Sequence, residues 1–236
     1  MGYEPMNESW QMAGERRETL GQYVAKTYLW MFAGLLVTFG IALAGYVTGA
    51  ILYVFQVPYA TLALTGLELL TVIWLSARIH KLSVGAARGL FLFYAALNGV
   101  VFSMYFLIFG VAEMVFVFAA TALFFGMMAG VSLIFKLDLS GIRPLLVGGL
   151  LFLILFGVLS MFLNLGGFET ALCYIGIVVF LGFTAYDTSK IRDNYQIFSA
   201  DPELLQKASV FSALQLYLDF INLFLYIIRL MNRNRK

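Results

Sequence analysis

The chain has 236 residues, of which 62% are hydrophobic and only 12% carry a charge, whereas about 25% of the residues of a soluble domain are charged. Four windows contain no lysine or arginine and a single carboxylate each: 27–77 with Glu68, 89–135 with Glu113, 144–186 with Glu169 and 208–228 with Asp219. No soluble enzyme, nucleic-acid-binding protein or disordered chain leaves so much of its sequence uncharged. The composition therefore predicts a multispanning protein of the lipid bilayer.

Seven membrane-spanning helices fit these windows. A helix needs about 20 apolar residues to cross the hydrocarbon, so the first three windows hold two helices each and the last holds one. Turn-forming residues divide the long windows near 45–58, 110–113 and 164–169. The predicted spans are 27–48, 57–78, 87–109, 113–135, 143–164, 168–188 and 207–229. We expect an all-α, seven-helix transmembrane domain over 27–230, between a polar tail at 1–26 and a basic tail at 231–236.

The distribution of basic residues predicts a cytoplasmic amino terminus, because lysine and arginine concentrate on the cytoplasmic side of membrane proteins. With seven spans, eleven of the 15 basic residues lie on the amino-terminal side. The other four are Arg229, Arg233, Arg235 and Lys236. A last segment that enters the membrane and returns would place all 15 on one side. Seven crossings are favoured, since 208–228 is continuous enough to span.

A polar stripe runs along the last predicted span. Its members follow spacings of three and four: Ser212, Gln215, Asp219, Asn222 and Tyr226. Such residues share one helix face, within an arc of roughly 80°. For the uncharged members we favour a hydrogen-bonding seam between helices. An ionisable group at this depth costs roughly 2.5–3.5 kcal/mol, so Asp219 is interpreted as functional.

The second predicted span carries a similar row, with Thr61, Thr65, Glu68 and Thr71 followed by Arg78. Glu68 is expected deep in the membrane and Arg78 at the cytoplasmic end. Arg78 has an equal alternative as an anchor that extends to the interface. His80 is interpreted as part of an interfacial loop, with a minor role in sensing pH as the alternative.

Asp187 lies near the cytoplasmic end of the sixth predicted span, before an expected loop at 189–206. Asp219 is about 12 residues into the last span, roughly 18 Å from that end. A direct pair would therefore need a tilted or broken helix. Taken alone, Asp187 is equally well explained as an interfacial partner of Lys190.

The smaller signals are assigned to packing. Cys173 is the only cysteine of the chain, and it is interpreted as a small buried residue. One histidine and one cysteine exclude a metal cluster built from these residue types, and no cofactor motif is present. The glycines spaced by four, Gly45 with Gly49 and Gly126 with Gly130, are expected where helices approach closely.

Two other seven-helix or two-aspartate classes fit poorly. An intramembrane aspartyl protease needs glycine-x-glycine before its second aspartate, whereas this chain has Tyr217 and Leu218 there. A retinal-binding receptor needs a lysine within the last helix, and 208–228 contains none. We therefore do not expect an enzyme or a photoreceptor.

The sequence resembles the transmembrane Bax inhibitor motif family, and most closely its bacterial inner-membrane branch. Four segments carry the likeness: Leu75-Ser76-Ala77-Arg78, Asp138-Leu139-Ser140-Gly141, Ala185-Tyr186-Asp187-Thr188 and the run from Leu216 to Phe224. The resemblance covers essentially the whole chain after residue 20. It implies a seven-helix bundle whose last helix is central and wrapped by the others.

The resemblance also implies a function. In this family, an aspartate pair on helices six and seven gates a pH-sensitive calcium leak, and by motif the pair is Asp187 and Asp219. An arginine on helix two, here Arg78, acts as a latch on the pair. Glu68, Ser212, Gln215 and Asn222 are the candidates for the rest of an ion path. Ca²⁺ would be a permeant ion that the two aspartates bind transiently, with no resident cofactor.

A second role is implied by bacterial relatives, which associate with a membrane-bound ATP-dependent protease and restrain its action on membrane proteins. Such a role would use the exposed tail 1–26 instead of the polar core. We expect no nucleic-acid partner, and a monomer is favoured although the sequence leaves the oligomeric state open.

Overall fold

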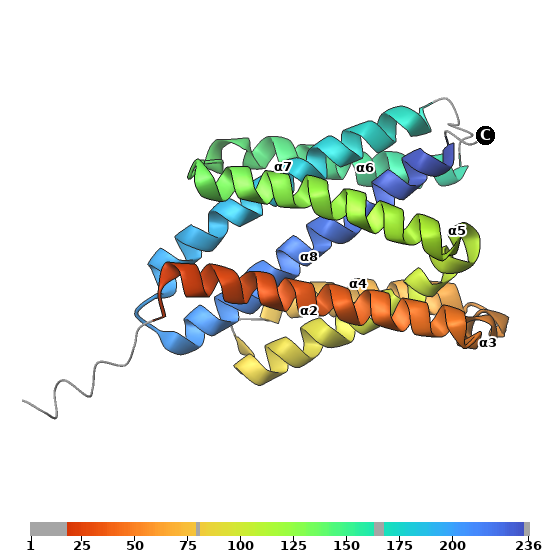
Figure 1. The fold of residues 1–236 in the computed structure, drawn as a ribbon, viewed down its shortest axis with the longest axis horizontal. Coiled ribbons are helices and arrows are strands. Elements are labelled where there is room, and N and C mark those ends of the chain that lie inside the picture. Colours follow the sequence, from red (N-terminus) through yellow and green to blue (C-terminus); the bar gives the residue numbers. More distant parts are fainter. Residues whose placement is uncertain (1–17, 79–80, 163–167, 234–236) are drawn as a thin grey trace, which may run out of the picture.

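The computed structural model describes residues 18–78, 81–162 and 168–233, and these form a helical bundle (Figure 1). Thus the expected tails are described only for Glu18–Lys26 and for residues 231–233, and His80 lies outside the described residues. In chain order the helices are α2 (Leu20–Val47), α3 (Ala50–Gln56), α4 (Ala60–Arg78), α5 (Val84–Ile134), the 3₁₀ turn η2 (Ser140–Ile142), α6 (Arg143–Phe162), α7 (Glu169–Phe198) and α8 (Pro202–Arg233).

Five of the described helices are long and apolar enough to cross a membrane: α2, α5, η2 with α6, α7 and α8. Helix α5 has 51 residues, more than twice the length that one crossing needs. It is broken at Gly110, where φ is 75° and ψ is 165°, a conformation that glycine adopts readily because it lacks a Cβ. The protein is therefore a polytopic helical membrane protein, and the predicted turn at 110–113 is confirmed.

Two connections differ from the prediction. The expected turn after residue 48 contains the short helix α3, which begins after Gly49 in the left-handed conformation. The expected loop at 189–206 is wrong, because α7 continues to Phe198 and α8 begins at Pro202. The carboxylate Oδ1 of Asp201 caps α8, accepting hydrogen bonds from the backbone N–H groups of Glu203 and Leu204 at 2.9 and 3.0 Å.

The extra helical turns are polar, which explains why hydropathy did not reveal them. Lys190 pairs with Asp193 three residues later, at 2.8 Å, and Lys207 pairs with Glu203 four residues earlier, also at 2.8 Å. Ion pairs at these spacings stabilise a helix in water by a few tenths of a kcal/mol each. Both helices therefore extend beyond the apolar stretch that marks the membrane.

Helix α8 contacts α2, α5 and α7 and crosses obliquely between them in Figure 1. In its most apolar stretch 61% of the residues are buried, against 11% to 39% in the other candidate spans. Its side chains Leu214, Leu216, Tyr217, Leu223 and Phe224 are fully inaccessible. The core of the bundle is consequently built around α8.

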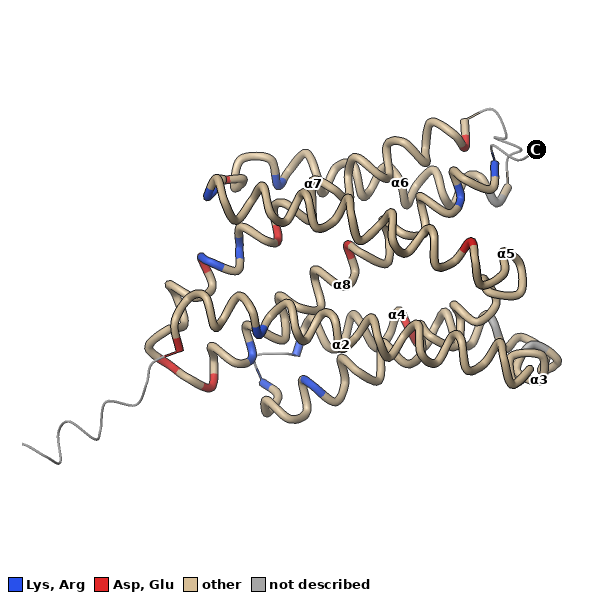
Figure 2. The backbone as a smooth tube through the Cα atoms, in the orientation of Figure 1, with Lys and Arg blue, Asp and Glu red and all other residues tan. Residues whose placement is uncertain are grey.

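Lysines and arginines gather at the end of the bundle where α2 and α8 begin (Figure 2). We call this the basic end; it includes Lys26, Arg78, Arg88, Arg143 and Lys190. The opposite end holds Arg229 and Arg233 among the described residues. Charge is therefore asymmetric across the structure, as the positive-inside rule requires of an oriented membrane protein.

Candidate functional site: a carboxyl pair between α7 and α8

Asp187 of α7 and Asp219 of α8 lie together inside the bundle, with exposed fractions of 6% and 5%. Their carboxyl groups are within hydrogen-bonding range of each other. Such a bond exists only if one of the two carboxyls carries a proton, since ionised carboxylates have no donor. If both are ionised, Oδ2 of Asp219 is buried without any hydrogen-bond partner among the described residues.

Helix geometry brings the two aspartates to one level. Asp187 lies about three turns before the end of α7, because that helix continues to Phe198. Asp219 lies about five turns after the start of α8 at Pro202. The oblique path of α8 in Figure 1 accounts for the remaining difference of roughly 9 Å. The expectation that a direct pair would need a tilted helix agrees with this arrangement.

Helix α2 closes the site from a third side. The hydroxyls of Tyr28 and Thr188 are hydrogen-bonded at 2.9 Å, so Tyr28 reaches the residue next to Asp187. Tyr28 is also near enough to Asp219 for the two to interact electrostatically. A tyrosine hydroxyl of α2 therefore lies near the pair.

The arginine that interacts electrostatically with Asp187 is Arg143, the first residue of α6. Arg78, the expected latch, is exposed at the last residue of α4. No hydrogen bond or ion pair joins Arg78 to either aspartate within the described part of the chain. From the sequence, Arg143 was only one of the eleven basic residues on the amino-terminal side, although it directly precedes the window 144–186 that contains no lysine or arginine.

The uncharged members of the polar stripe have separate partners. Ser212 is buried and accepts a hydrogen bond from Asn194 of α7 at 3.0 Å, so it does join two helices. The amide of Asn222 donates instead to the carbonyl of Leu218 in its own helix at 2.8 Å. Gln215 is half-buried. Asn194 was missed because it lies in the segment that was expected to be a loop.

Glu68 is half-buried in α4, and its Oε1 atom is buried without a hydrogen-bond partner among the described residues. It interacts electrostatically with Tyr94 of α5 and Tyr217 of α8. On α8, Glu68 is near Tyr217, whereas Asp187 is near Asp219 two residues later. Residues two apart in a helix point about 200° apart, so Glu68 and Asp187 approach α8 from different sides. The structure therefore does not bring Glu68 to the aspartate pair.

The other threonines of that row lie apart as well. Thr65 is exposed, and Thr71 is buried but donates to the carbonyl of Leu67 in its own helix at 2.7 Å. The side chain of Thr61 lies outside the described residues. No group of three or more histidine, cysteine, aspartate or glutamate side chains suited to a metal occurs in the ranges that the structure covers.

Residues 20–236 match the family described as Bax1-I, inhibitor of apoptosis-promoting Bax1. The chain belongs to the Bax1-I family. The resemblance drawn from the four sequence segments is thereby confirmed, and the match covers every described helix.

Among Bax1-I relatives, inner membrane protein YbhL of Escherichia coli K12 is 38% identical over 221 residues, which are 93% of this chain and 94% of that protein. An uncharacterized protein of Deinococcus radiodurans is 34% identical over 226 residues, 94% of this chain and 96% of its own. An uncharacterized protein of Borreliella burgdorferi is 32% identical over 229 residues, 94% and 97% of the two chains. The similarity thus extends over nearly the full length of each.

Proposed function

We propose that this protein is a pH-sensitive calcium leak channel of the cell inner membrane, gated by a proton shared between Asp187 and Asp219. The observation that carries the proposal is the direct approach of two buried carboxyl groups from neighbouring helices. Membership of the Bax1-I family and similarity to an inner membrane protein support it. We propose seven crossings, with α4 and each half of α5 as separate spans and the basic end in the cytoplasm.

The gate would work through like-charge repulsion. When one proton is shared, the hydrogen bond between the carboxyls ties α7 to α8. When that proton leaves, two like charges remain close together; as a guide, unit charges about 4 Å apart repel by about 4 kcal/mol at an effective dielectric of about 20. Deprotonation therefore favours separation of the two helices. The leak should therefore increase as the pH rises.

Separation would move an aromatic cluster that fills the bundle beyond the pair. Phe220 follows Asp219 directly, and its ring lies 5.4 Å from that of Phe118. Phe39 contacts Phe118 and Phe224 with ring centroids at 4.6 and 5.5 Å. Because Phe220 and Phe224 belong to α8, a displacement of this helix at Asp219 would disturb the cluster. The described arrangement corresponds to the closed state.

Calcium would bind the open gate only transiently. Ca²⁺ takes six to eight oxygen ligands, and two carboxylates provide at most four. Water and backbone carbonyls would have to complete the shell, which keeps binding weak enough for release. A resident calcium site is therefore not part of the proposal, and the ion is a passenger.

The test is a flux assay on the full-length protein in liposomes that contain a calcium-sensitive dye. Between about pH 6 and pH 8, calcium entry through the wild type should rise with pH. Asp219→Asn should remove this rise, since a neutral amide can donate to Asp187 at every pH and keeps the helices tied. Asp193→Asn is the matched control, because Asp193 is half-exposed on α7, the helix of Asp187, and pairs with Lys190.

The control should keep the wild-type profile. Equal flux through wild type and Asp219→Asn over this range would show that the pair does not gate the protein.

A further inference from the structure

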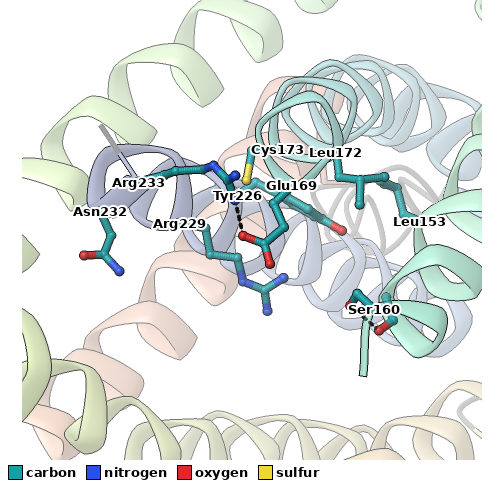
Figure 3. Close-up of a pocket in the computed structure, with 10 residues that line it drawn as sticks. Leu153, Ser160, Glu169, Leu172, Cys173, Tyr226, Arg229, Asn232 and Arg233 are labelled. Carbon is teal, nitrogen blue, oxygen red and sulfur yellow. Dashed lines mark hydrogen bonds and ion pairs between the residues drawn. The ribbon is translucent and has the colours of Figure 1, made fainter. Parts of the chain in front are cut away.

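A cleft of about 860 Å³ opens between α6, α7 and α8 at the end opposite to the basic end. Its volume is within the range of small-molecule sites, about 300–1,000 Å³. Figure 3 shows Arg229 and Arg233 of α8 on one side of it, Glu169 and Cys173 of α7 beside them, and Ser160 of α6 across from them. The cleft is separate from the aspartate pair, because Arg229 lies roughly 15 Å along α8 from Asp219.

The cleft exists because α6 diverges from the bundle. Toward the basic end α6 packs tightly on α7: a Cβ atom added at Gly149 would lie 2.8 Å from Val179, and one at Gly182 would lie 2.6 Å from Leu146. Farther along α6, a Cβ atom at Gly157 would have no neighbour within 4 Å. The helices therefore form a wedge that is closed at the basic end and open where Gly157 lines the cleft.

The mouth of the cleft carries a positive charge. Arg233 forms an ion pair with Glu169, drawn as a dashed line in Figure 3. The guanidinium of Arg229 lies 5.6 Å from the ring of Tyr226 and makes no ion pair with any described residue. One guanidinium is thus free to bind an anion, and Asn232 also lines the cleft. Guanidinium groups suit phosphate because they donate two parallel hydrogen bonds.

The interior of the cleft is apolar. Leu153 and Leu172 line it, and Leu153 is roughly 13 Å along α6 from the end of that helix at Phe162. Phe162 at the end of α6 and Phe168 just before α7 are exposed apolar side chains. A small hydrated anion would make no favourable contact with an apolar interior. A lipid would match both the interior and the mouth of the cleft, with its acyl chain inside and its headgroup at the arginines.

We propose that this cleft binds one anionic phospholipid, with its phosphate at Arg229 and an acyl chain along Leu153 and Gly157. The proposal does not depend on calcium transport. The occupant is a lipid of the adjacent leaflet, and the experiment below distinguishes it from a soluble phosphate.

The test is native mass spectrometry of the full-length protein in detergent, titrated with phosphatidylglycerol or phosphatidylcholine. The wild type should retain one phosphatidylglycerol about tenfold more tightly than phosphatidylcholine. Arg229→Gln should weaken phosphatidylglycerol binding by about tenfold and leave phosphatidylcholine unchanged. Lys81→Gln is the matched control: it removes one positive charge from an exposed site at the basic end and should bind like the wild type.

A second variant tests the apolar part without altering charge. Gly157→Leu should weaken both lipids, because the new side chain occupies the path of the acyl chain, whereas Gly126→Leu, also at an open position, should not. Wild-type binding by both Arg229→Gln and Gly157→Leu would overturn the proposal. Displacement of phosphatidylglycerol by an equal concentration of glycerol phosphate would also overturn it, since the site would then hold a soluble anion.

Discussion

The two carboxyl groups of the proposed gate have different surroundings. Asp187 interacts with the guanidinium of Arg143, whereas Asp219 has the hydroxyl of Tyr28 near it and one oxygen without a donor. A positive charge favours the ionised form of the nearer carboxylate, so the shared proton should be held mainly by Asp219. Arg143 would then set the pH at which the pair loses its last proton.

This assignment predicts the effect of removing Arg143. Because deprotonation opens the gate, Arg143→Gln should require a higher pH for opening, and the pH of half-maximal calcium flux should rise by about 0.5 to 1. The effect is modest because Arg143 is exposed and its charge is screened. The measurement is the liposome flux assay over a series of pH values. Arg78→Gln is the comparison, and a larger shift for Arg78→Gln would restore Arg78 as the latch.

A second charged residue, Asp138, makes its contribution outside the membrane-spanning helices. The backbone N–H of Ser140 donates to its Oδ1 at 3.0 Å, and this bond lowers the pKa of Asp138 below its ordinary value. A carboxylate with a lowered pKa stabilises the fold above the pKa of the unfolded chain, about 3.9. That contribution is lost as the pH falls through the pKa of the folded state.

We therefore expect the melting temperature of the wild type to exceed that of Asp138→Asn by a margin that shrinks as the pH falls from about 5 to about 3. The asparagine still offers an oxygen to Ser140 but does not titrate. Other carboxyl groups titrate in both proteins and cancel in the difference. Thermal unfolding in detergent measures this difference in melting temperature. A difference that is independent of pH would contradict the lowered pKa of Asp138.

At the residue scale the sequence predicted the chemistry better than the contacts. Asp219 was identified by its depth in a helix of apolar residues, which is a property of one segment. Its neighbour Asp187 was placed near the end of its helix, because hydropathy stops at Lys190, whereas the helix continues to Phe198. Arg143 and Tyr28 come from other helices, so only the packing of the bundle identifies them as neighbours of the pair.

At the scale of the helices, close approach depends on particular glycines. Gly99 of α5 packs against α2, where an added Cβ would lie 2.8 Å from the carbonyl oxygen of Thr38 and 2.8 Å from Ile41. The side-chain hydroxyl of Thr38 donates a hydrogen bond to the carbonyl of Ala95 at 2.8 Å and lies 2.7 Å from the hydroxyl of Tyr217, to which it is also hydrogen-bonded. Helices α2, α5 and α8 are therefore fixed together at this level.

Gly99→Ala should destabilise the protein by about 1–3 kcal/mol, because a backbone atom cannot move aside for the new methyl group. Gly126→Ala should have the opposite sign and stabilise by up to about 1 kcal/mol, since its position is open and alanine favours helix. Unfolding by denaturing detergent measures both. Equal stability of the two variants would show that α2 and α5 do not meet at Gly99.

The glycine spacings illustrate what a helical sequence leaves open. Gly45 and Gly49 were expected at a helix contact. Gly45 does lie against Ser103, because a Cβ atom added there would be 2.6 Å from the Ser103 hydroxyl oxygen. Gly49, in contrast, directly precedes α3 and has a φ of 69°. Gly126 and Gly130, with the same spacing, face open space. The long apolar helices were predictable because crossing a membrane constrains the length and composition of each segment. Which helix faces contact each other could not be predicted, since nearly all of these faces are apolar.

Taken as a whole molecule, the charge pattern bears on where a cation would enter. The end opposite to the basic end holds the cleft with Arg229 and Arg233, which would repel Ca²⁺ and attract an anionic headgroup. Glu68, with an unpartnered buried oxygen, lies on a different side of α8. A calcium path through the proposed channel should therefore avoid the cleft between α6, α7 and α8.

The direction of α8 decides the topology of the whole chain. Helices α2 and α8 begin at the basic end, and α8 continues to Arg233, which pairs with Glu169 at the first residue of α7. The described end of α8 therefore lies on the side opposite to the start of α2. With the basic end in the cytoplasm, Arg229 and Arg233 would lie outside, against the usual bias.

Labelling of single cysteines in intact bacterial cells tests this arrangement, in a Cys173→Ser background that removes the only native thiol. A maleimide that cannot cross membranes should modify Asn232→Cys without permeabilisation. It should modify Ala200→Cys, in the connection between α7 and α8, only after permeabilisation, because that connection belongs to the basic end. Tyr59→Cys, at an exposed position between α3 and α4, is the reference for the outer side and does not depend on α8. If Asn232→Cys behaves like Ala200→Cys while Tyr59→Cys is labelled from outside, α8 does not cross, and the cleft with its arginines would have to face the cytoplasm.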